Sequence, residues 1–246
     1  MAGFVFVMGA ARSGTTAMAE LLNHHPRVCL GIERFKYVKA LSPALFEEER
    51  FFAFDAKDTN ILPGLDEHWR GIYEAMRFKW PGAVVHGDKL GARLLGRVLE
   101  GFPDARIVYM LRGIDGVASS WNARARKGDG RWPASNDYRA AVPSWNTVNA
   151  AALEARSARP SRMLVVEYER FFSGGAGPAE QLAAWLGVEP ATGFLAAHAA
   201  SSTHYRDVVA GKPREPMPGQ SEFIRANADL ATYGKLLAIA RSQSAG

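Results

Sequence analysis

Gly9 and Gly14, with four residues between them, have the spacing that most directly indicates chemistry in this sequence. They lie in the segment 9–16 (GAARSGTT), which follows the apolar run 4–8 and opens the helix-forming stretch 15–23. Glycines let the backbone approach a phosphate closely, and the free N–H groups of a helix N-terminus point at it. The segment 9–16 is therefore predicted to be a phosphate-cradling loop between a strand and a helix, as nucleotide-using enzymes have.

The position after the second glycine departs from the loop of nucleotide hydrolases. In those enzymes a lysine stands there, and the next Ser or Thr holds Mg²⁺. Here Thr15 takes the place of the lysine, and the positive charge comes earlier, at Arg12. The apolar run 106–111 is followed by Arg112, whereas a magnesium site would need a carboxylate there. The loop is expected to bind an anion whose transferred group carries less charge and needs no metal.

Arg112 and Ser120, eight residues apart, provide a second candidate anchor for a phosphate. Arg112 follows the predicted strand 106–111, and parallel strands deliver residues to the ligand edge of their sheet at that point. An arginine supplies a bidentate fork and a serine a single hydroxyl, so both could donate to one phosphate. A surface ion pair also explains an arginine at a strand end.

Together the two segments resemble the sulfotransferases that use 3′-phosphoadenosine 5′-phosphosulfate (PAPS). Residues 12–16 (RSGTT) are similar to that family's loop for the 5′-phosphosulfate, and Arg112 and Ser120 match its pair for the 3′-phosphate. Residues 165–169 (VVEYE) are similar to a further family strand, whereas 113–114 (GI) depart from the family's usual Asn-Pro or Asp-Pro. The resemblance, from residue 4 to about 187, implies that the donor is released as 3′-phosphoadenosine 5′-phosphate (PAP). The donor-binding residues that it implies are Ala11, Arg12, Ser13, Gly14, Thr15, Thr16, Arg112 and Ser120.

Glu33 is the candidate general base. Transfer to a hydroxyl or amine needs a group that takes the proton of the acceptor. The resemblance implies a glutamate shortly after the first helix and second strand, and Glu33 occupies that place. A surface carboxylate paired with Arg34 or Lys36 also explains it. Other family members use a histidine, which leaves His24, His25 and His86 as alternatives.

Lys89 is the second candidate catalytic residue. It ends the segment 87–89 (GDK), which follows the predicted strand 83–86 and matches a G-x-K segment of the family. The resemblance implies a lysine near the reacting group, where it could neutralise charge on the leaving oxygen. A solvated surface lysine explains the residue as well. Because a sulfuryl group carries less charge than a phosphoryl group, its transfer can rely on backbone amides, hydroxyls and Arg12 without a metal.

Apolar segments that alternate with helical ones, and no Asn-Gly hairpin signal, predict an α/β fold with a parallel β-sheet flanked by helices. The resemblance implies the same P-loop-like fold. One domain, residues 1–246, is expected, with 34–80, 127–145 and 200–226 inserted as lid and acceptor-pocket segments. The predicted strands are 4–8, 28–30, 83–86, 106–111 and 163–168, and the predicted helices are 15–23, 115–126, 138–156 and 179–186.

The acceptor, expected to be a small molecule or a carbohydrate, has no motif of its own. Residues 35–80 hold 10 of the 26 aromatic residues, which could line an apolar acceptor pocket or form the core of a helical cap. Lys212 and Arg214 lie in a Pro-rich loop where the family often closes a basic segment over the nucleotide. A basic run near Ser120 is either a solvated face or a means of steering anions. It consists of Arg124, Arg126, Lys127 and Arg131.

The composition limits the remaining choices. A net charge of +5 suits an anionic ligand and is too mild to indicate nucleic-acid binding. Cys29 is the only cysteine, which excludes an internal disulfide and a cysteine-based zinc cluster. No signal peptide and no membrane span of about 18 apolar residues are found, so a cytoplasmic protein is expected. Two other functions stay open, a P-loop small-molecule kinase that uses Mg-ATP and a nucleotide-binding module without turnover.

Overall fold

Five short, largely buried strands pair in parallel, and helices cover both faces of their sheet. The computed structural model describes residues 3–128, 132–211 and 216–243. The sheet has the order β2-β3-β1-β4-β5, so the first strand of the chain lies at the centre. The strands are β1 Gly3–Gly9, β2 Val28–Ile32, β3 Val85–Lys89, β4 Arg106–Leu111 and β5 Met163–Glu167. The predicted fold class is confirmed.

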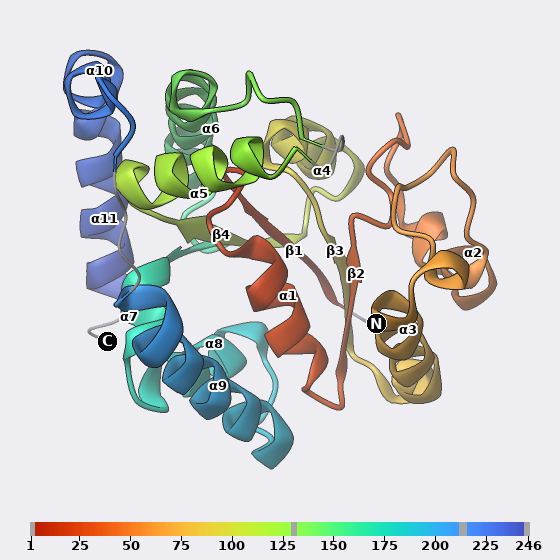
Figure 1. Ribbon diagram of the computed structural model, residues 1–246. Coiled ribbons are helices and arrows are strands. Elements are labelled where there is room, and N and C mark those ends of the chain that lie inside the picture. The colour runs from red at the N-terminus through yellow and green to blue at the C-terminus, as the bar shows by residue number, and fades with distance from the viewer. Residues whose placement is uncertain (1–2, 129–131, 212–215, 244–246) are drawn as a thin grey trace.

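Successive residues of β1 point to opposite faces of the sheet and belong to two separate cores. Val5 and Val7 pack on one side, and Phe6 and Met8 on the other. The helices of the first side are α1 Thr15–Asn23, α7 Tyr168–Ser173, α8 Gly177–Leu186 and α9 Thr192–His204. Those of the second side are α2 Glu48–Phe52, α3 Glu67–Lys79, α4 Leu95–Gly101, α5 Ile114–Lys127, α6 Tyr138–Ala158, α10 Gln220–Asn227 and α11 Leu230–Gln243 (Figure 1).

The strand register brings the carboxyl ends of four strands to one edge of the sheet. Lys89 at the end of β3 is level with Ile32 of β2 and with Val7 of β1, and Gly9 is level with Met110 of β4. The helices α1 and α5 begin just beyond β1 and β4, so their N-termini lie at the same edge (Figure 1). Residues that follow these strands therefore meet although they are far apart in the sequence.

The strand predicted over 83–86 is displaced toward its carboxyl end. It runs from Val85 to Lys89, so Asp88 and Lys89 are its last residues and do not follow it. The polar residues Asp88 and Lys89 hide the end of this strand in the sequence, because a buried strand is expected to be apolar. Asp88 is nevertheless fully buried and accepts two backbone hydrogen bonds, from Arg34 (3.1 Å) and Phe35 (2.9 Å). The strand predicted over 28–30 is also longer, because it extends to Ile32.

The segment 34–80 forms the helices α2 and α3, and its aromatic side chains mostly fill the core beside β2. Phe46, for example, packs against Phe4 and Phe6 of β1 with ring centroids 5.5 and 5.9 Å apart. Of its ten aromatic residues, all of them described, eight belong to or pack against this core, whereas Tyr37 and Phe78 are exposed. The helical-cap interpretation of this segment therefore accounts for most of its aromatic residues.

The C-terminal third is more helical than the sequence predicts. The segment 200–226 contains the end of α9, a π-helical turn over Tyr205–Ala210 and nearly all of α10, while 212–215 lie outside the described residues. Helix α11 packs against β5 and α6 and is absent from the sequence-based prediction. None of the described helices has the length and apolar character required to cross a bilayer.

Candidate active site

The loop after β1 is a tight turn with two left-handed residues. The backbone N–H of Ser13 donates to the carbonyl of Ala10 (3.0 Å), and Arg12 and Gly14 have φ of 72° and 89°. A side chain at Gly9 would bring its Cβ to 2.7 Å from a carbonyl oxygen of β4, so this position needs a glycine. For a non-glycine residue such as Arg12 the left-handed conformation is strained, and such strain concentrates at functional sites.

Helix α1 presents an uncapped N-terminus to the cleft. Its N-cap residue is Gly14, which has no side chain to accept from the first N–H groups, and its first turn contains no acidic residue. Four N–H groups at such a helix end lack partners within the helix, and the helix dipole adds partial positive charge. Thr15 and Thr16 add two hydroxyls at this place, so the N-terminus of α1 suits an anion.

Arg112 and Ser120 contact the loop directly, although they lie about a hundred residues further along the chain. Arg12 Nε donates to Ser120 Oγ (2.9 Å), and Arg112 Nη1 donates to the carbonyl of Arg12 (2.8 Å). The indole of Trp121, the residue after Ser120, donates to the carbonyl of Ala11 (3.0 Å). Helix α5 and the end of β4 thus hold the loop through its backbone and place two arginines beside one serine.

The guanidinium of Arg112 lies in a largely buried position suited to a phosphate. It stacks over the ring of Tyr168 at 4.4 Å, and its Nε is 3.6 Å from a carboxylate oxygen of Glu169. Arg112 is 9% exposed, and its Nε makes no hydrogen bond among the described residues. Buried N–H groups of an arginine rarely remain without an acceptor, so an anionic ligand here would supply one.

Glu33 lies in a second strained turn, directly after β2. Its φ is 53°, and in the described part of the chain only Arg12 shares a positive φ among non-glycine residues. Its N–H donates to the carbonyl of Lys89 (2.9 Å), its Oε1 accepts from Lys89 Nζ (2.7 Å), and its Oε2 accepts from Lys36 Nζ (2.8 Å). Burial acts to raise the pKa of Glu33, but the two ammonium groups hold it below its usual value. Glu33 is thus ionised at neutral pH.

The turn at Glu33 is held from beneath by buried polar groups. Asp88 accepts from the next two backbone N–H groups, those of Arg34 and Phe35, and burial raises its pKa to about 7. The side chain of Arg34 is fully buried and points away from Glu33, because it donates to the carbonyl of Phe51 (2.7 Å) and pairs with Asp58 (3.2 Å). Of the two surface ion pairs suggested by the sequence, the pair with Lys36 forms and the pair with Arg34 does not.

Sequence comparison decides the family. The model of the sulfotransferase family matches residues 5–192, about three quarters of the chain. The chain belongs to the sulfotransferase family. None of the curated proteins matches it in sequence.

Solved sulfotransferase structures share its fold. A sulfotransferase domain from the curacin biosynthetic pathway is 15% identical, with 92% of this chain and 97% of that chain covered and a TM-score of 0.55. The sulfotransferase domain of the Synechococcus PCC 7002 olefin synthase is 17% identical, with 91% and 94% covered and a TM-score of 0.53. Sulfotransferase STF9 from Mycobacterium avium is 13% identical, with 96% and 75% covered and a TM-score of 0.53. Identities this low establish a common fold only.

In this sulfotransferase, one cleft of about 660 Å³ at the strand ends collects most of the residues singled out in the sequence. Ser13 is the exception, since it is fully buried beneath the loop and its Oγ has no hydrogen-bond partner among the described residues. None of the three alternative histidines lines the cleft; His25 bonds to the carbonyl of Glu189, and His86 packs against Trp80. The predicted residues in the lining are Ala11, Arg12, Gly14, Thr15, Thr16, Glu33, Lys89, Arg112 and Ser120.

The far side of the cleft is built from residues that the sequence did not single out. Leu94, Trp132, Ser144 and Val148 line it together with Tyr37, the one aromatic residue of 35–80 that does so. The four residues other than Tyr37 belong to no common sequence motif, so only the folded structure shows that they line the cleft. Arg124, Arg126 and Lys127 of the basic run lie on the last turns of α5 outside the lining, whereas Arg131, Lys212 and Arg214 lie outside the described residues.

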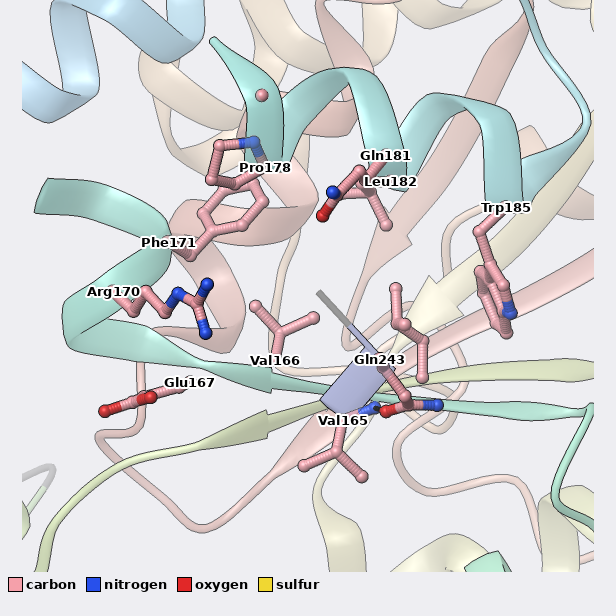
Figure 2. Close-up of a pocket in the computed structure, with 12 residues that line it drawn as sticks. Val165, Val166, Glu167, Arg170, Phe171, Pro178, Gln181, Leu182, Trp185 and Gln243 are labelled. Carbon is pink, nitrogen blue, oxygen red and sulfur yellow. Dashed lines mark hydrogen bonds between the residues drawn. The ribbon is translucent and has the colours of Figure 1, made fainter. Parts of the chain in front are cut away.

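A second cavity of about 270 Å³ lies beside the edge strand β5 and is lined by none of the predicted site residues. Figure 2 shows its mainly apolar walls from β5, α7 and α8, among them Val166, Phe171 and Leu182. Gln243 of α11 pairs with the free edge of β5, because its amide oxygen accepts from the Val165 N–H (3.0 Å) and its amide nitrogen donates to the Met163 carbonyl (3.2 Å). This side-chain pairing protects the sheet edge.

Proposed function

We propose that this protein transfers a sulfuryl group from PAPS to a hydroxyl or amine of a small-molecule or carbohydrate acceptor. The observation that carries the proposal is the meeting of two anion anchors with a carboxylate–ammonium pair in one cleft. The anchors are the Arg12 loop and the Arg112–Ser120 pair, and the carboxylate–ammonium pair is Glu33 with Lys89. A bare phosphate site would need only the first anchor.

The two anchors suit a nucleotide with anionic groups at both ends. The uncapped α1 N-terminus, with Arg12 and two threonine hydroxyls, would hold the 5′-phosphosulfate. Arg112 and Ser120 would hold the 3′-phosphate, and the unsatisfied Nε of Arg112 supports that assignment. The same ligand gives a reason for the strained backbone at Arg12, because this residue lines the cleft and such strain concentrates at functional sites.

Glu33 is proposed as the base that takes the acceptor proton. PAPS supplies the sulfuryl group: a bond forms from the acceptor oxygen or nitrogen to sulfur, while the bridging O–S bond breaks and its electron pair passes to the 5′-phosphate of PAP. Glu33 is ionised, so it has an electron pair for the proton as that bond forms. Its two carboxylate oxygens bind Lys89 and Lys36, contacts that fix its orientation and keep it charged.

Lys89 and Arg12 are proposed to stabilise charge in the transition state. Lys89 is 7% exposed, so its ammonium group acts through a weakly screening environment. It sits between the base and the donor side of the cleft, since β3 lies between β2 and β1. Charge that builds on the leaving oxygen would be neutralised there, and this contribution is larger in the transition state than in the ground state.

The acceptor is proposed to enter over the inserted segments. Tyr37 and Lys36 of the segment 34–80 and Trp132 and Ser144 of the segment 127–145 line the cleft, which supports their role as acceptor-pocket material. The segment 200–226 is proposed as lid material on the donor side. There Gln220 is buried and accepts from Asn122 of α5 (2.7 Å).

The direct test is incubation of the protein with radiolabelled PAPS and a panel of hydroxylated and amino acceptors, with labelled product read after chromatography and mass analysis. We expect labelled acceptor together with an equal amount of PAP. Glu33→Gln should abolish nearly all product, and Glu47→Gln, at an exposed acid outside the cleft, serves as its control. Labelled product at the wild-type rate from Glu33→Gln would exclude Glu33 as the base.

A further inference from the structure

One cationic side chain of the cleft has no role in the proposed donor site. Glu33 is the only acidic residue among the described lining residues, whereas five cationic side chains line the same space. Three of these are assigned to the donor and its leaving group, and Lys36 binds Glu33. One cation is left over, Arg93. The five are Arg12, Lys36, Lys89, Arg93 and Arg112.

Arg93 follows the strand that ends with Lys89. The donor anchors follow β1 and β4, whereas Glu33 and Lys89 lie at the ends of β2 and β3, on the other side of β1. Arg93 lies in the 3₁₀ turn Ala92–Leu94 that follows β3. Arg93 therefore shares its strand end with Lys89 and not with either donor anchor.

Arg93 is poised to accept an anionic partner. Its side chain is exposed, and its Nη2 donates to Ser144 Oγ of α6 (3.3 Å). Among the described residues, Ser144 is its only hydrogen-bond partner and no carboxylate pairs with it. An arginine fork beside a hydroxyl is a common arrangement for carboxylate and phosphate groups. Most surface arginines lie in open solvent, but this one faces a cleft that contains a predicted base.

Apolar side chains lie next to this pair. Leu94 and Val148 line the same cleft with the half-exposed ring of Tyr37. Val148 is one helical turn beyond Ser144 on α6, so the two residues share a face of that helix. The acceptor side thus combines an apolar wall with one cationic fork.

We propose that the acceptor is an amphiphile with a carboxylate or phosphate group held by Arg93 and Ser144, an apolar portion against Leu94, Val148 and Tyr37, and its nucleophilic hydroxyl or amine at Glu33. The proposal rests on the proposed function, since it names the acceptor class of the same site. It also gives Arg93 a role, because an anionic group of the acceptor would pair with a cation that the donor does not use.

The test measures ligand binding to the PAP-saturated protein by calorimetry. The probes are ω-hydroxyoctanoate, ω-hydroxyoctyl phosphate and methyl ω-hydroxyoctanoate, which share a chain and a hydroxyl and differ in charge. We expect at least one of the two anions to bind about tenfold or more tightly than the ester, as a charge-assisted hydrogen bond implies. Whichever anion binds more tightly identifies the group. Arg93→Gln should remove the preference, and Arg97→Gln, at an exposed arginine of α4 outside the cleft, should retain it.

Two results would overturn the proposal. One is an ester that binds as tightly as both anions in the wild-type protein, and the other is a preference that survives Arg93→Gln. PAP is titrated into the same proteins first. Failure of the wild-type protein to bind PAP would contradict the proposed donor site itself, whereas PAP binding without an anion preference would contradict the acceptor class alone.

Discussion

The proposed donor half and the proposed acceptor half of the cleft are built in different ways. In the donor half, the side chains of Arg112 and Trp121 donate hydrogen bonds to backbone carbonyls of the loop. The N-terminus of helix α1 completes the site. In the acceptor half, Glu33 depends on Asp88 and Arg34, side chains buried beneath it. Each half contains one strained non-glycine residue. Anion binding in the donor half thus relies on backbone groups of the loop and of helix α1, whereas the orientation of the proposed base relies on charged side chains buried beneath its turn.

Loss of the base is expected to have the largest effect. Glu33→Gln keeps the size of the side chain and removes its negative charge, so no group remains to take the acceptor proton. We expect kcat to fall by about 100-fold or more, the usual range for a general base. PAP affinity should stay within about twofold of the wild-type value, because a base on the acceptor side contributes little to the binding of the donor. Steady-state kinetics with a PAP titration measures both values, and a parallel loss of PAP affinity would show that the halves are not separate.

Loss of the second anchor should affect only the donor half. Arg112→Ala removes the fork proposed for the 3′-phosphate, so PAP affinity should fall by roughly 100-fold, as expected for two charge-assisted hydrogen bonds. Adenosine 5′-monophosphate lacks the 3′-phosphate and should bind the variant almost as well as the wild type. Arg112→Lys, which keeps the charge and loses the fork, should be intermediate. An equal loss for both nucleotides would mean that Arg112 acts only by holding the carbonyl of Arg12.

A change beneath the base tests whether the acceptor half depends on buried support. In Asp88→Asn one oxygen still accepts from the backbone, but an amide nitrogen faces the other N–H group. We expect kcat to fall about tenfold and the free energy of unfolding to drop by about 1–3 kcal/mol. PAP affinity should be retained. Asp104→Asn, at an acid whose side chain is 91% exposed and pairs with Arg162 at the surface, is the control for loss of an exposed carboxylate. If the Asp88→Asn protein is less stable but its kcat is unchanged, Asp88 supports the fold and does not position Glu33 for the reaction.

The smallest expected effect is a shift in pH dependence. Lys36 is one of two cations that lower the pKa of Glu33, so Lys36→Met should raise that pKa. Turnover requires ionised Glu33, and therefore its decline toward acid pH should begin at a higher pH in the variant. The pH profile of kcat measures this, with Lys39→Met at an exposed lysine as the control. A shift toward lower pH would contradict the assignment of Glu33 as the titrating base.

The same comparison explains what the sequence could predict. The parallel sheet, the loop at Gly9 and the location of Arg112 and Ser120 in one cleft were predictable, because each follows from a local pattern and from the topology, although β3 lies further along the chain than its pattern predicted. The support of Glu33 by Asp88 was not, since it joins residues more than fifty positions apart and makes an acidic residue part of a buried strand. The acceptor wall from Leu94 and Ser144 was also hidden, because it depends on how α6 packs over the turn after β3.

Binding of a 3′-phosphorylated adenine nucleotide by the proposed donor half can be tested by a competition titration. PAP would be titrated into the protein by calorimetry in the presence of EDTA, and the titration would be repeated with saturating Mg-ATP in place of EDTA. We expect tight PAP binding in EDTA, which Arg112→Ala weakens and Mg-ATP barely affects. Tight binding of Mg-ATP together with no binding of PAP would contradict it.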